Sequence, residues 1–392
     1  MNKKISLGLT ISIAALVAAV TFIVTTFFNL RGFNEKVQAV NEKAAKYERL
    51  EMLDSFVRKN FYTELDEESM LNGMLKGYVA GLQDPYSNYL TPQEYKALLE
   101  KETGTMIGIG VTAQLQEDGT IKIVAVQEGS PAEESGLQPN DVIIAIDDRD
   151  VTEMAFEDAV NLIKGDEGTN VRIRILRDDR ERNVSVIRRT FDLKTVKGRM
   201  LPGNIGYISI SNFRDNTGEQ FRSTLDDLIA NGAGSLIFDV RDNGGGLLRS
   251  LEESLDPLLP EGEIAIATYR DGTTDTAVYS DAAELDIPMV VLINGSSASA
   301  AELFAASLRD FGKAKLVGEN SFGKGIMQIT KELDDGSGLT LTIATYQTTR
   351  SECYHKVGLA PDVAVESGEE TVIENVDPAT DPQLAAAIEL LR

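Results

Sequence analysis

The sequence predicts a multidomain α/β protein, and three patterns along its 392 residues support that fold class. Apolar residues recur at spacings of three and four between residues 37 and 57, which is typical of an amphipathic helix. Short alternating strands follow between residues 108 and 188. From residue 206 onward strands and helices alternate, which favours a parallel or mixed sheet covered by helices. We place the domain boundaries at residues 1–30, 31–100, 101–190 and 191–392.

Residues 1–30 begin with "MNKK" and continue with an uncharged run from Ile5 to Phe28. A helix needs about 20 apolar residues to span a bilayer, whereas a signal-peptide core has roughly 7–15. We therefore predict a transmembrane signal anchor, with a signal peptide that is removed as the alternative. Because Lys3 and Lys4 precede the run, the N-terminus is expected in the cytoplasm. The remainder would then lie on the extracytoplasmic side of the cell membrane, attached by a single pass.

The charge balance excludes several function classes. There are 38 Lys and Arg residues against 62 Asp and Glu residues, which gives a net charge of −24. Such an acidic surface argues against sequence-independent nucleic-acid binding, which needs a basic face.

The chain has one cysteine, Cys353, and one histidine, His355, so an intrachain disulfide is excluded and a metal site built on Cys or His is not expected. We expect no metal and no cofactor.

Residues 31–100 are expected to be mainly helical. After the pattern at 37–57, a second helical pattern begins at "DEESMLNGMLKGYVAGL", with acidic residues in its first turn. Two helices bury little apolar surface by themselves. They are therefore expected to pack against the main body or against another copy of the chain.

Residues 101–190 contain "GIGV", the turn and helix "SPAEESGL", and "NDVIIAIDD", and together these resemble a PDZ domain. The loop Gly108, Ile109, Gly110 and Val111 has glycines that expose backbone N–H groups. Such groups can bind the C-terminal carboxylate of a peptide while the next strand pairs with that peptide. Considered alone, the loop could equally be an ordinary entry to a hairpin.

Residues 191–392 alternate strands with helices and end in a short helix, "DPQLAAAIELLR". The strands are "IGYISIS", "SLIFDVR", "PMVVLIN", "KLVGE" and "LTLTIATYQ", and the main helices lie in "GEQFRSTLDDLIANG", "RSLEESLDPLL" and "ASAAELFAASLRDFG". The pattern predicts an α/β core. Asp239 and Arg241 end one strand and are interpreted as a structural pair.

The segment "INGSSASAAE" carries Ser296, Ser297 and Ser299 between a buried strand and a helix. Folds of this class place nucleophiles at such turns, because the N-terminus of the helix offers free N–H groups to an oxyanion. Ser299 and Glu302 also match a capping box. From this segment alone, a helix cap is the simpler interpretation.

The segment "GENSFGKGIMQ" supplies a proton acceptor in a chain with a single histidine. Glycines on both sides of Lys324 let the backbone bend and bring the amine inward. A lysine acts as a base only when neutral, and burial in an apolar site can lower its pKa far below the ordinary value of about 10.4. The apolar runs "VVLIN" and "KLVG" offer such a site, and a Ser-Lys pair is a known variant of the catalytic triad.

At this point the chain resembles the carboxyl-terminal processing, or tail-specific, serine proteases. The resemblance begins near Leu50 and includes "GLQDPYSNYL", the PDZ-like segment, "DVRDNGGGLL", the serine and lysine segments, and "GLAPDV". It implies a crotonase/ClpP-like α/β protease core and a dimer formed through the N-terminal helices. It also implies Ser299 as nucleophile, Lys324 as general base and Gln328 as the group that orients Lys324.

Residue chemistry supports part of this assignment. Positions four apart in a flat strand are about 13 Å apart, so the chain must bend near Gly325 for Gln328 to reach Lys324. The expected oxyanion hole uses the Ala300 N–H and one N–H from Gly245 or Gly246. Of the remaining polar residues, Asp310 is expected to be an exposed acid, His355 a loop residue and Cys353 inert.

The sequence therefore predicts a membrane-anchored serine endopeptidase that cleaves or trims protein C-termini. Its PDZ domain would capture apolar C-terminal tails of unfolded proteins and gate the active site. One alternative is an inactive PDZ scaffold that only binds tails. Another is a crotonase-like body that binds a small apolar ligand, although that reading does not account for the PDZ-like segment.

Overall fold

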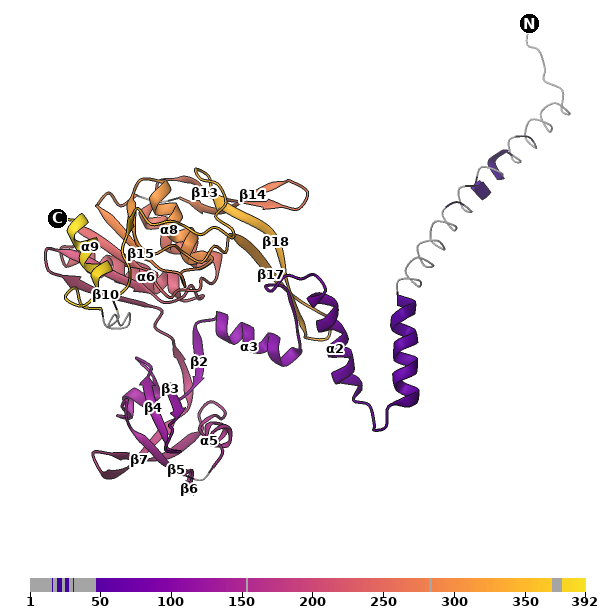
Figure 1. The fold of residues 1–392 in the computed structure, drawn as a ribbon, viewed down its shortest axis with the longest axis horizontal. Coiled ribbons are helices and arrows are strands. Elements are labelled where there is room, and N and C mark those ends of the chain that lie inside the picture. The colour runs from indigo at the N-terminus through magenta and orange to yellow at the C-terminus, as the bar shows by residue number, and fades with distance from the viewer. Residues whose placement is uncertain are drawn as a thin grey trace, which may run out of the picture. The chain divides into compact units, whose positions relative to one another are not determined.

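The computed structural model describes residues 16, 20–22, 25–27, 31, 47–152, 154–281, 284–368 and 376–392. The chain divides into two compact units, Met1–Met74 and Leu75–Arg392 (Figure 1). The predicted transmembrane run from Ile5 to Phe28 falls mostly outside the described residues, and its described residues 16, 20–22 and 25–27 are helical. Within the described part of the chain, no helix has both the length and the apolar character needed to cross a bilayer.

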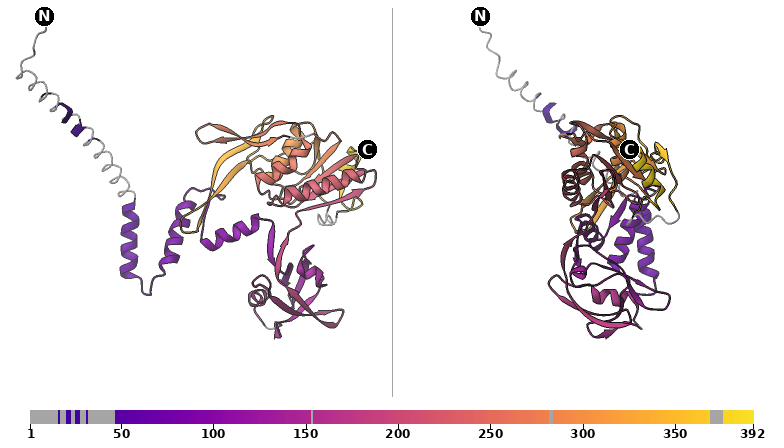
Figure 2. Two further views of the ribbon diagram at one scale, coloured as in Figure 1. Left: turned by 180° about the vertical axis from the view of Figure 1, so that it is seen from behind. Right: turned by 90° about the vertical axis from the view of Figure 1, so that its left-hand side faces the viewer.

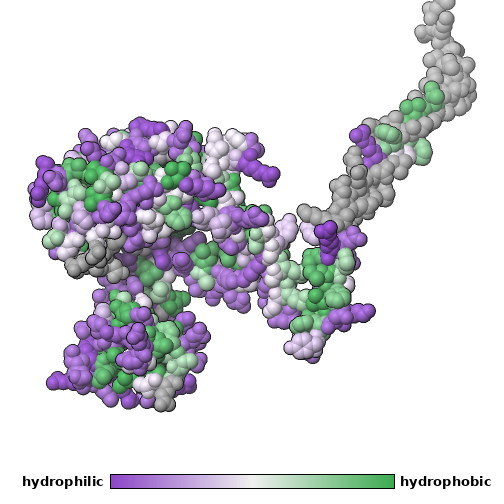
Figure 3. Space-filling model, viewed as in Figure 1, coloured by the Kyte–Doolittle hydropathy of each residue, from purple (hydrophilic) through white to green (hydrophobic). Residues whose placement is uncertain are grey.

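The first unit contains a helix over residues 47–60 and the start of α2 (Glu67–Ala80). Arg58 joins them, since its guanidinium lies 2.7 Å from Asp54 and 2.5 Å from Glu67. Hydrophobic residues lie on the surface of the first helix (Figure 3). Leu53 is 59% exposed and Phe56 is 67% exposed. The predicted helix is thus confirmed for residues 47–57, and its first ten residues lie outside the described ranges.

The PDZ-like segment folds as an antiparallel sheet in the order β3-β4-β5-β7-β8, with β6 paired to β5. Its elements are β3 (Val111–Leu115), β4 (Ile121–Val126), α4 (Pro131–Glu134), β5 (Val142–Ile146), β6 (Arg149–Asp150), α5 (Phe156–Ile163), β7 (Asn170–Arg177) and β8 (Arg180–Ile187). Alternate residues of the strands, such as Ile123, Ile143 and Ile173, fill a core of their own. This arrangement matches the strand and helix order that the sequence predicts.

A two-stranded ribbon links this domain to the rest of the second unit. It pairs β2 (Thr105–Gly108) with β9 (Arg189–Asp192), and Gly108 lies opposite Arg189. Asn216 binds the far end of the ribbon, since its amide nitrogen donates to the carbonyl oxygens of Gly104 at 2.9 Å and Leu193 at 3.4 Å.

The central sheet has six strands in the order β10-β11-β12-β15-β16-β19, and all neighbours are parallel except β10 and β11. The strands are β10 (Val196–Leu201), β11 (Ile205–Ile210), β12 (Ser235–Asp239), β15 (Met289–Ile293), β16 (Ala314–Gly318) and β19 (Val363–Ala364). Both β12 and β15 are buried along their whole length, and their sequences accordingly consist mainly of apolar residues.

Helices cover both faces of this sheet because side chains alternate between them. Ile208, Phe238 and Val291 point into one core with three of the helices, and Tyr207, Ile237 and Val290 point into another with the C-terminal helix. The helices are α6 (Thr217–Ala230), α7 (Leu248–Leu255) with the short η1 (Asp256–Leu258), α8 (Ala300–Asp310) and α9 (Pro382–Leu390). The α/β core is thus confirmed.

A second sheet, which the sequence analysis only partly anticipated, has the order β1-β18-β13-β14, with β17 also paired to β18. Its strands are β1 (Asn88–Leu90), β13 (Gly262–Tyr269), β14 (Thr274–Ser280), β17 (Ile326–Glu332) and β18 (Gly338–Thr348). The hairpin of β17 and β18 projects from the core (Figure 2). The helix α3 (Pro92–Glu102) follows β1 and carries a capping box of Thr91 and Glu94.

Asp239 and Arg241 form a buried structural pair, as the sequence predicts. The Arg241 guanidinium lies 2.5 Å from Asp239 and 2.8 Å from Asp381, the residue that caps α9. Its remaining nitrogen donates to Gln383 at 2.8 Å. The cluster therefore ties the last helix to the carboxyl end of β12.

Candidate active site

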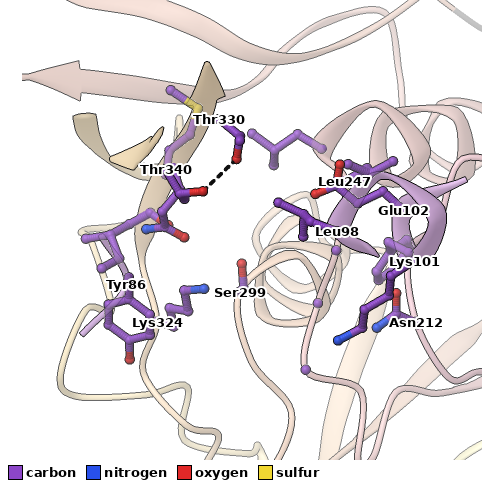
Figure 4. A pocket seen from close by; sticks show the side chains of 18 of the residues that line it. Tyr86, Leu98, Lys101, Glu102, Asn212, Leu247, Ser299, Lys324, Thr330 and Thr340 are labelled. Carbon is purple, nitrogen blue, oxygen red and sulfur yellow. Dashed lines mark hydrogen bonds between the residues drawn. The ribbon is translucent and has the colours of Figure 1, made fainter. Parts of the chain in front are cut away.

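A cleft of about 670 Å³ lies where the helix α8, the segment before β17 and the loop before β1 meet (Figure 4). Ser299, Lys324 and Gln328 all line it, as do Gly245 and Gly246. Its remaining walls are mixed, with apolar side chains such as Leu98, Leu247 and Met327 beside polar and charged ones that include Lys101, Glu102 and Arg214. Residues from distant parts of the sequence that were singled out for their chemistry are thus brought into one cavity.

The structure distinguishes the three serines. Ser296 is exposed, and Ser297 is buried with its hydroxyl donating to the Val240 carbonyl at 2.7 Å. Ser299 is the one that lines the cleft, at the N-cap of α8. Its backbone has φ +57° and ψ −119°, a conformation that costs energy for a residue with a Cβ. A strained turn before a helix is how α/β hydrolases expose a nucleophile.

Glu302 connects the serine to the lysine. One oxygen of its buried carboxylate accepts hydrogen bonds from the backbone N–H groups of Ser299 at 2.9 Å and Lys324 at 2.8 Å. The other oxygen accepts from the Ser321 hydroxyl at 2.6 Å and the Gly323 N–H at 2.7 Å. The predicted capping interaction is therefore one part of a larger role, because the same carboxylate positions both segments.

Lys324 lies between β16 and β17, and its amine points toward the Ser299 hydroxyl (Figure 4). Burial lowers the pKa of the Lys324 amine, although the nearby carboxylates of Asp84 and Glu302 act in the opposite direction. The amine lies 4.5 Å from the centre of the Tyr86 ring. It makes no hydrogen bond within the described residues, and catalytic contacts are often long in a ligand-free enzyme.

Asp84 and Tyr86 belong to the loop that precedes β1. The Asp84 carboxylate accepts from the Ser87 hydroxyl at 2.6 Å, and Ser87 in turn accepts from the Thr342 N–H at 3.1 Å. Burial works to raise the pKa of Asp84, but hydrogen bonds from Ser87 and Thr342 keep it below its ordinary value. A carboxylate is therefore fixed near the lysine by contacts with β18.

Gln328 lines the cleft, but its amide donates to the Thr342 hydroxyl at 3.1 Å and to the Ile326 carbonyl at 3.4 Å. The pairing of β17 with β18 is interrupted between Met327 and Gln328. Lys324 and Gly325 lie before β17 begins at Ile326, so the spacing of a flat strand does not apply to the whole stretch from Lys324 to Gln328. An orienting contact from Gln328 to Lys324 stays a prediction.

The backbone N–H groups expected to form an oxyanion hole are not equivalent. The Gly245 N–H donates to the Asn243 side chain at 2.8 Å and is therefore engaged. The N–H groups of Ala300 and Gly246 have no partner among the described residues. A Cβ on Gly245 would lie 2.7 Å from that of Ser299 and 2.9 Å from the Ala300 nitrogen, so only glycine fits there. Ala300 and Gly246 are therefore the pair whose N–H groups are free to bind an oxyanion.

In the PDZ-like domain, the Gly108–Val111 loop turns between β2 and β3, with Gly110 at φ +83°. The Gln127 N–H donates to the Gly110 carbonyl at 2.8 Å, which makes Val111 and Val126 a non-hydrogen-bonded pair. The Val111 N–H therefore points to the open edge of β3. The N–H groups of Ile109 and Gly110 have no partner within the described ranges, so the loop offers a set of donors suited to a carboxylate.

Three other polar residues differ in their surroundings. The prediction that Asp310 is an exposed acid was wrong, because its side chain is 8% exposed and accepts from the Thr348 hydroxyl at 2.5 Å. His355 lies in a turn, and its Nδ1 is buried without a partner among the described residues. The Cys353 thiol donates to the Gly325 carbonyl at 3.4 Å. Of the three residues, Asp310 has a structural role, because its carboxylate holds Thr348 at the end of β18.

Sequence reasoning missed two residues that shape the cleft, Tyr346 in its wall and Asn243 behind the glycine turn. Tyr346, on β18, has a hydroxyl within hydrogen-bond distance of both Ser299 and Lys324. Asn243 fixes the glycine turn, since its amide donates to the Ile210 carbonyl at 2.8 Å while its oxygen accepts from Gly245. Asn243 could have been noticed in "DNGGG", but nothing in the strand "LTLTIATYQ" marks Tyr346.

The arrangement can perform nucleophilic acyl chemistry. It combines a hydroxyl at a helix N-terminus, an amine whose pKa is lowered and free backbone donors beside the hydroxyl. Over the described part of the chain, no cluster of His, Cys, Asp and Glu is suited to hold a metal ion.

Three family models match the sequence. The model of peptidase family S41 matches residues 204–365, the PDZ domain model matches residues 122–177, and the model of the activating protease CtpB N-terminal domain matches residues 13–93. Together the three matches extend over most of the chain. From the N-terminus onward they come in the order N-terminal domain, PDZ domain and peptidase domain.

Curated relatives align over nearly the whole sequence. The carboxy-terminal processing protease CtpA of Bacillus subtilis is 34% identical over 370 residues, covering 93% of this chain and 78% of that protein. A carboxyl-terminal-processing protease of Synechocystis is 35% identical over 341 residues, covering 85% and 77%. A Bacteroides fragilis structure assigned to the S41 proteases superimposes with a TM-score of 0.57 at 19% identity, covering 86% of this chain and 96% of that one, and it supports the fold alone.

Proposed function

The chain belongs to the carboxy-terminal processing proteases of peptidase family S41, and from that premise we propose that it is a membrane-anchored serine endopeptidase that cleaves or trims the C-terminal tails of proteins. The observation that carries this proposal is the meeting of Ser299 and Lys324 in one cleft beside the free N–H groups of Ala300 and Gly246.

The proposed mechanism follows from these positions. Neutral Lys324 takes the proton of Ser299 as the Ser299 oxygen attacks the scissile carbonyl. The N–H groups of Ala300 and Gly246 stabilise the oxyanion that forms. The Lys324 ammonium then gives its proton to the leaving amine, and a water molecule hydrolyses the acyl-enzyme by the same route. Gln328 would orient the Lys324 amine after its side-chain amide gives up the hydrogen bond to the Thr342 hydroxyl and turns toward Lys324.

The proposed substrates are unfolded proteins with apolar C-termini. The free N–H groups of the Gly108–Val111 loop support binding of a terminal carboxylate, and the open edge of β3 supports pairing with an extended tail. The apolar part of the cleft wall, which includes Leu247 and Met327, supports binding of an apolar residue near the cut. In this proposal the PDZ domain delivers the tail and gates the site.

The proposed assembly is a homodimer with each chain anchored in the cell membrane by a single helix. The exposed apolar side chains on the helix at 47–60, such as Leu53 and Phe56, support burial against a second copy. The uncharged run from Ile5 to Phe28 supports the anchor, with the catalytic body on the extracytoplasmic side.

The test uses full-length protein in detergent and an unfolded reporter with either an apolar or an Asp-ended tail. We expect kcat/KM to be at least about tenfold higher for the apolar tail, because burying an unpaired Asp side chain in an apolar site costs more than the roughly 1.4 kcal/mol that corresponds to a factor of ten. The Ser299→Ala variant should bind both reporters and cut neither. Equal cleavage of the two tails would contradict tail capture, and binding without cleavage by the unaltered protein would favour an inactive scaffold.

The pH dependence of cleavage should respond to Asp84. Lys324 is an effective base only when neutral, so kcat/KM rises as pH increases through its pKa. Since Asp84 raises that pKa, Asp84→Asn should move the acid limb of the profile to lower pH. Glu302 and the Tyr86 ring, the other groups that favour the ammonium, are unchanged in this variant.

A matched control for this experiment is Asp335→Asn. Asp335 also accepts a hydrogen bond from a nearby serine, Ser337, but does not contribute to the Lys324 pKa. Its pH profile should coincide with that of the unaltered protein. An acid limb that stays in place or moves to higher pH in Asp84→Asn would contradict the role of Lys324 as the base.

A further inference from the structure

Two buried side chains each contact both Ser299 and Lys324. Glu302 binds the backbone N–H groups of the two residues, as described above. Tyr346 approaches them from β18, with its hydroxyl 3.3 Å from the Ser299 hydroxyl and 3.0 Å from the Lys324 carbonyl. The nucleophile and the base, which lie on separate segments, are therefore joined at two points.

The Tyr346 hydroxyl has one hydrogen for these two neighbours. The Lys324 carbonyl can only accept, and its distance is the shorter one. The Tyr346 hydroxyl is the donor in both contacts, so its hydrogen is shared between the Lys324 carbonyl and the Ser299 oxygen, and the Ser299 hydrogen stays available to Lys324. Burial raises the pKa of Tyr346, which keeps the hydroxyl protonated.

The surroundings make this hydroxyl a fixed point. Tyr346 is 2% exposed, and its backbone N–H donates to the Gly325 carbonyl at 3.1 Å. Its ring packs edge-on against Tyr354 with 6.2 Å between ring centres. Because the ring is enclosed and its strand is paired on both sides, the hydroxyl cannot move away without displacing β18.

We propose that Tyr346 is a positioning residue of the active site, which sets the direction of the Ser299 hydroxyl and the place of the Lys324 backbone. This inference rests on the proposed function, in which Ser299 attacks and Lys324 takes its proton. Tyr346 acts through these two residues and takes no part in the proton transfer. With the backbone fixed by Tyr346 and Glu302, only the flexible Lys324 side chain has to rotate to reach Ser299.

The test is Tyr346→Phe, which removes the hydroxyl and keeps the ring. We expect kcat for tail cleavage to fall about 10–100-fold with KM within about twofold, because a small displacement of reacting groups affects the chemical step. Labelling of Ser299 by a fluorophosphonate probe should slow by a similar factor. The midpoint of thermal unfolding should stay close to that of the unaltered protein.

The matched control is Tyr207→Phe. Tyr207 is a buried tyrosine that does not line the cleft, and its hydroxyl donates to Asp239 at 2.7 Å. This variant should keep both kcat and the labelling rate. An unchanged Tyr346→Phe enzyme, or equal losses in the two variants, would overturn the inference. Since labelling needs no tail, normal labelling of a protein that never cuts tails would refute the proposed substrate without refuting the role of Tyr346.

Discussion

Replacing Lys324 with methionine should lower kcat for tail cleavage by about 10³-fold, within the range typical of removing a general base. Methionine keeps an unbranched apolar chain of similar length. The Lys324 amine makes no hydrogen bond within the described residues, and burial lowers its pKa. Its removal is therefore expected to leave the unfolding midpoint unchanged or slightly higher. The measurements are single-turnover cleavage and thermal unfolding of the same preparation.

The double variant with Ser299→Ala sharpens this result. Residues that act in one proton transfer are strongly non-additive, so the double variant should be no slower than Ser299→Ala alone. His355→Asn serves as the control, since His355 does not line the cleft and its replacement should leave kcat within about twofold. Retained cleavage in Lys324→Met, or loss in His355→Asn alone, would show that the proton acceptor is misassigned.

Replacing Arg241 with methionine should have the largest effect on stability. The Arg241 side chain is 1% exposed and forms ion pairs with the buried carboxylates of Asp239 and Asp381. Removing one partner of a buried ion pair leaves charges without compensation and typically costs about 3–5 kcal/mol. The loss should appear in denaturant unfolding, with release of α9 as the structural consequence.

An exposed pair provides the comparison. Arg222 lies 3.4 Å from Asp256 with its side chain 53% exposed, and such pairs contribute about 0–1 kcal/mol. Arg222→Met should therefore change the free energy of unfolding little. If the two substitutions had equal effects, the buried cluster would not stabilise the α9 contact as described. The variants of Lys324 and Arg241 thus separate loss of chemistry from loss of fold.

Much of the fold could be predicted because its strongest signals are local. The apolar runs of β12 and β15 and the helix starting after Ser299 are recognisable in windows of a few residues. The hairpin of β13 and β14 was missed, although Asp271 and Gly272 form its turn. The short strand β1 has too few residues to show a period, and only its pairing with β18 defines it.

The site was predictable only where a residue type and its spacing indicate chemistry. Ser299 and Lys324 carry that signal, and the structure brings both to the cleft. Tyr346 does not, because its role depends on a contact with a residue 47 positions away. The Gly245 N–H could not be distinguished from that of Gly246 without the side chain of Asn243, which engages one and leaves the other free.

The pairing of Gly108 with Arg189 in the β2–β9 ribbon means that the PDZ domain is an insertion with adjoining ends. The catalytic body is consequently discontinuous along the chain. It needs β1 from before the insertion, which pairs with β18, and α9 from near the C-terminus, which Arg241 anchors through Asp381. A tail-binding module could thus be gained, exchanged or lost at one ribbon without rearranging either sheet of the enzyme. The smallest autonomous protease would have to include chain segments from both before and after the PDZ domain.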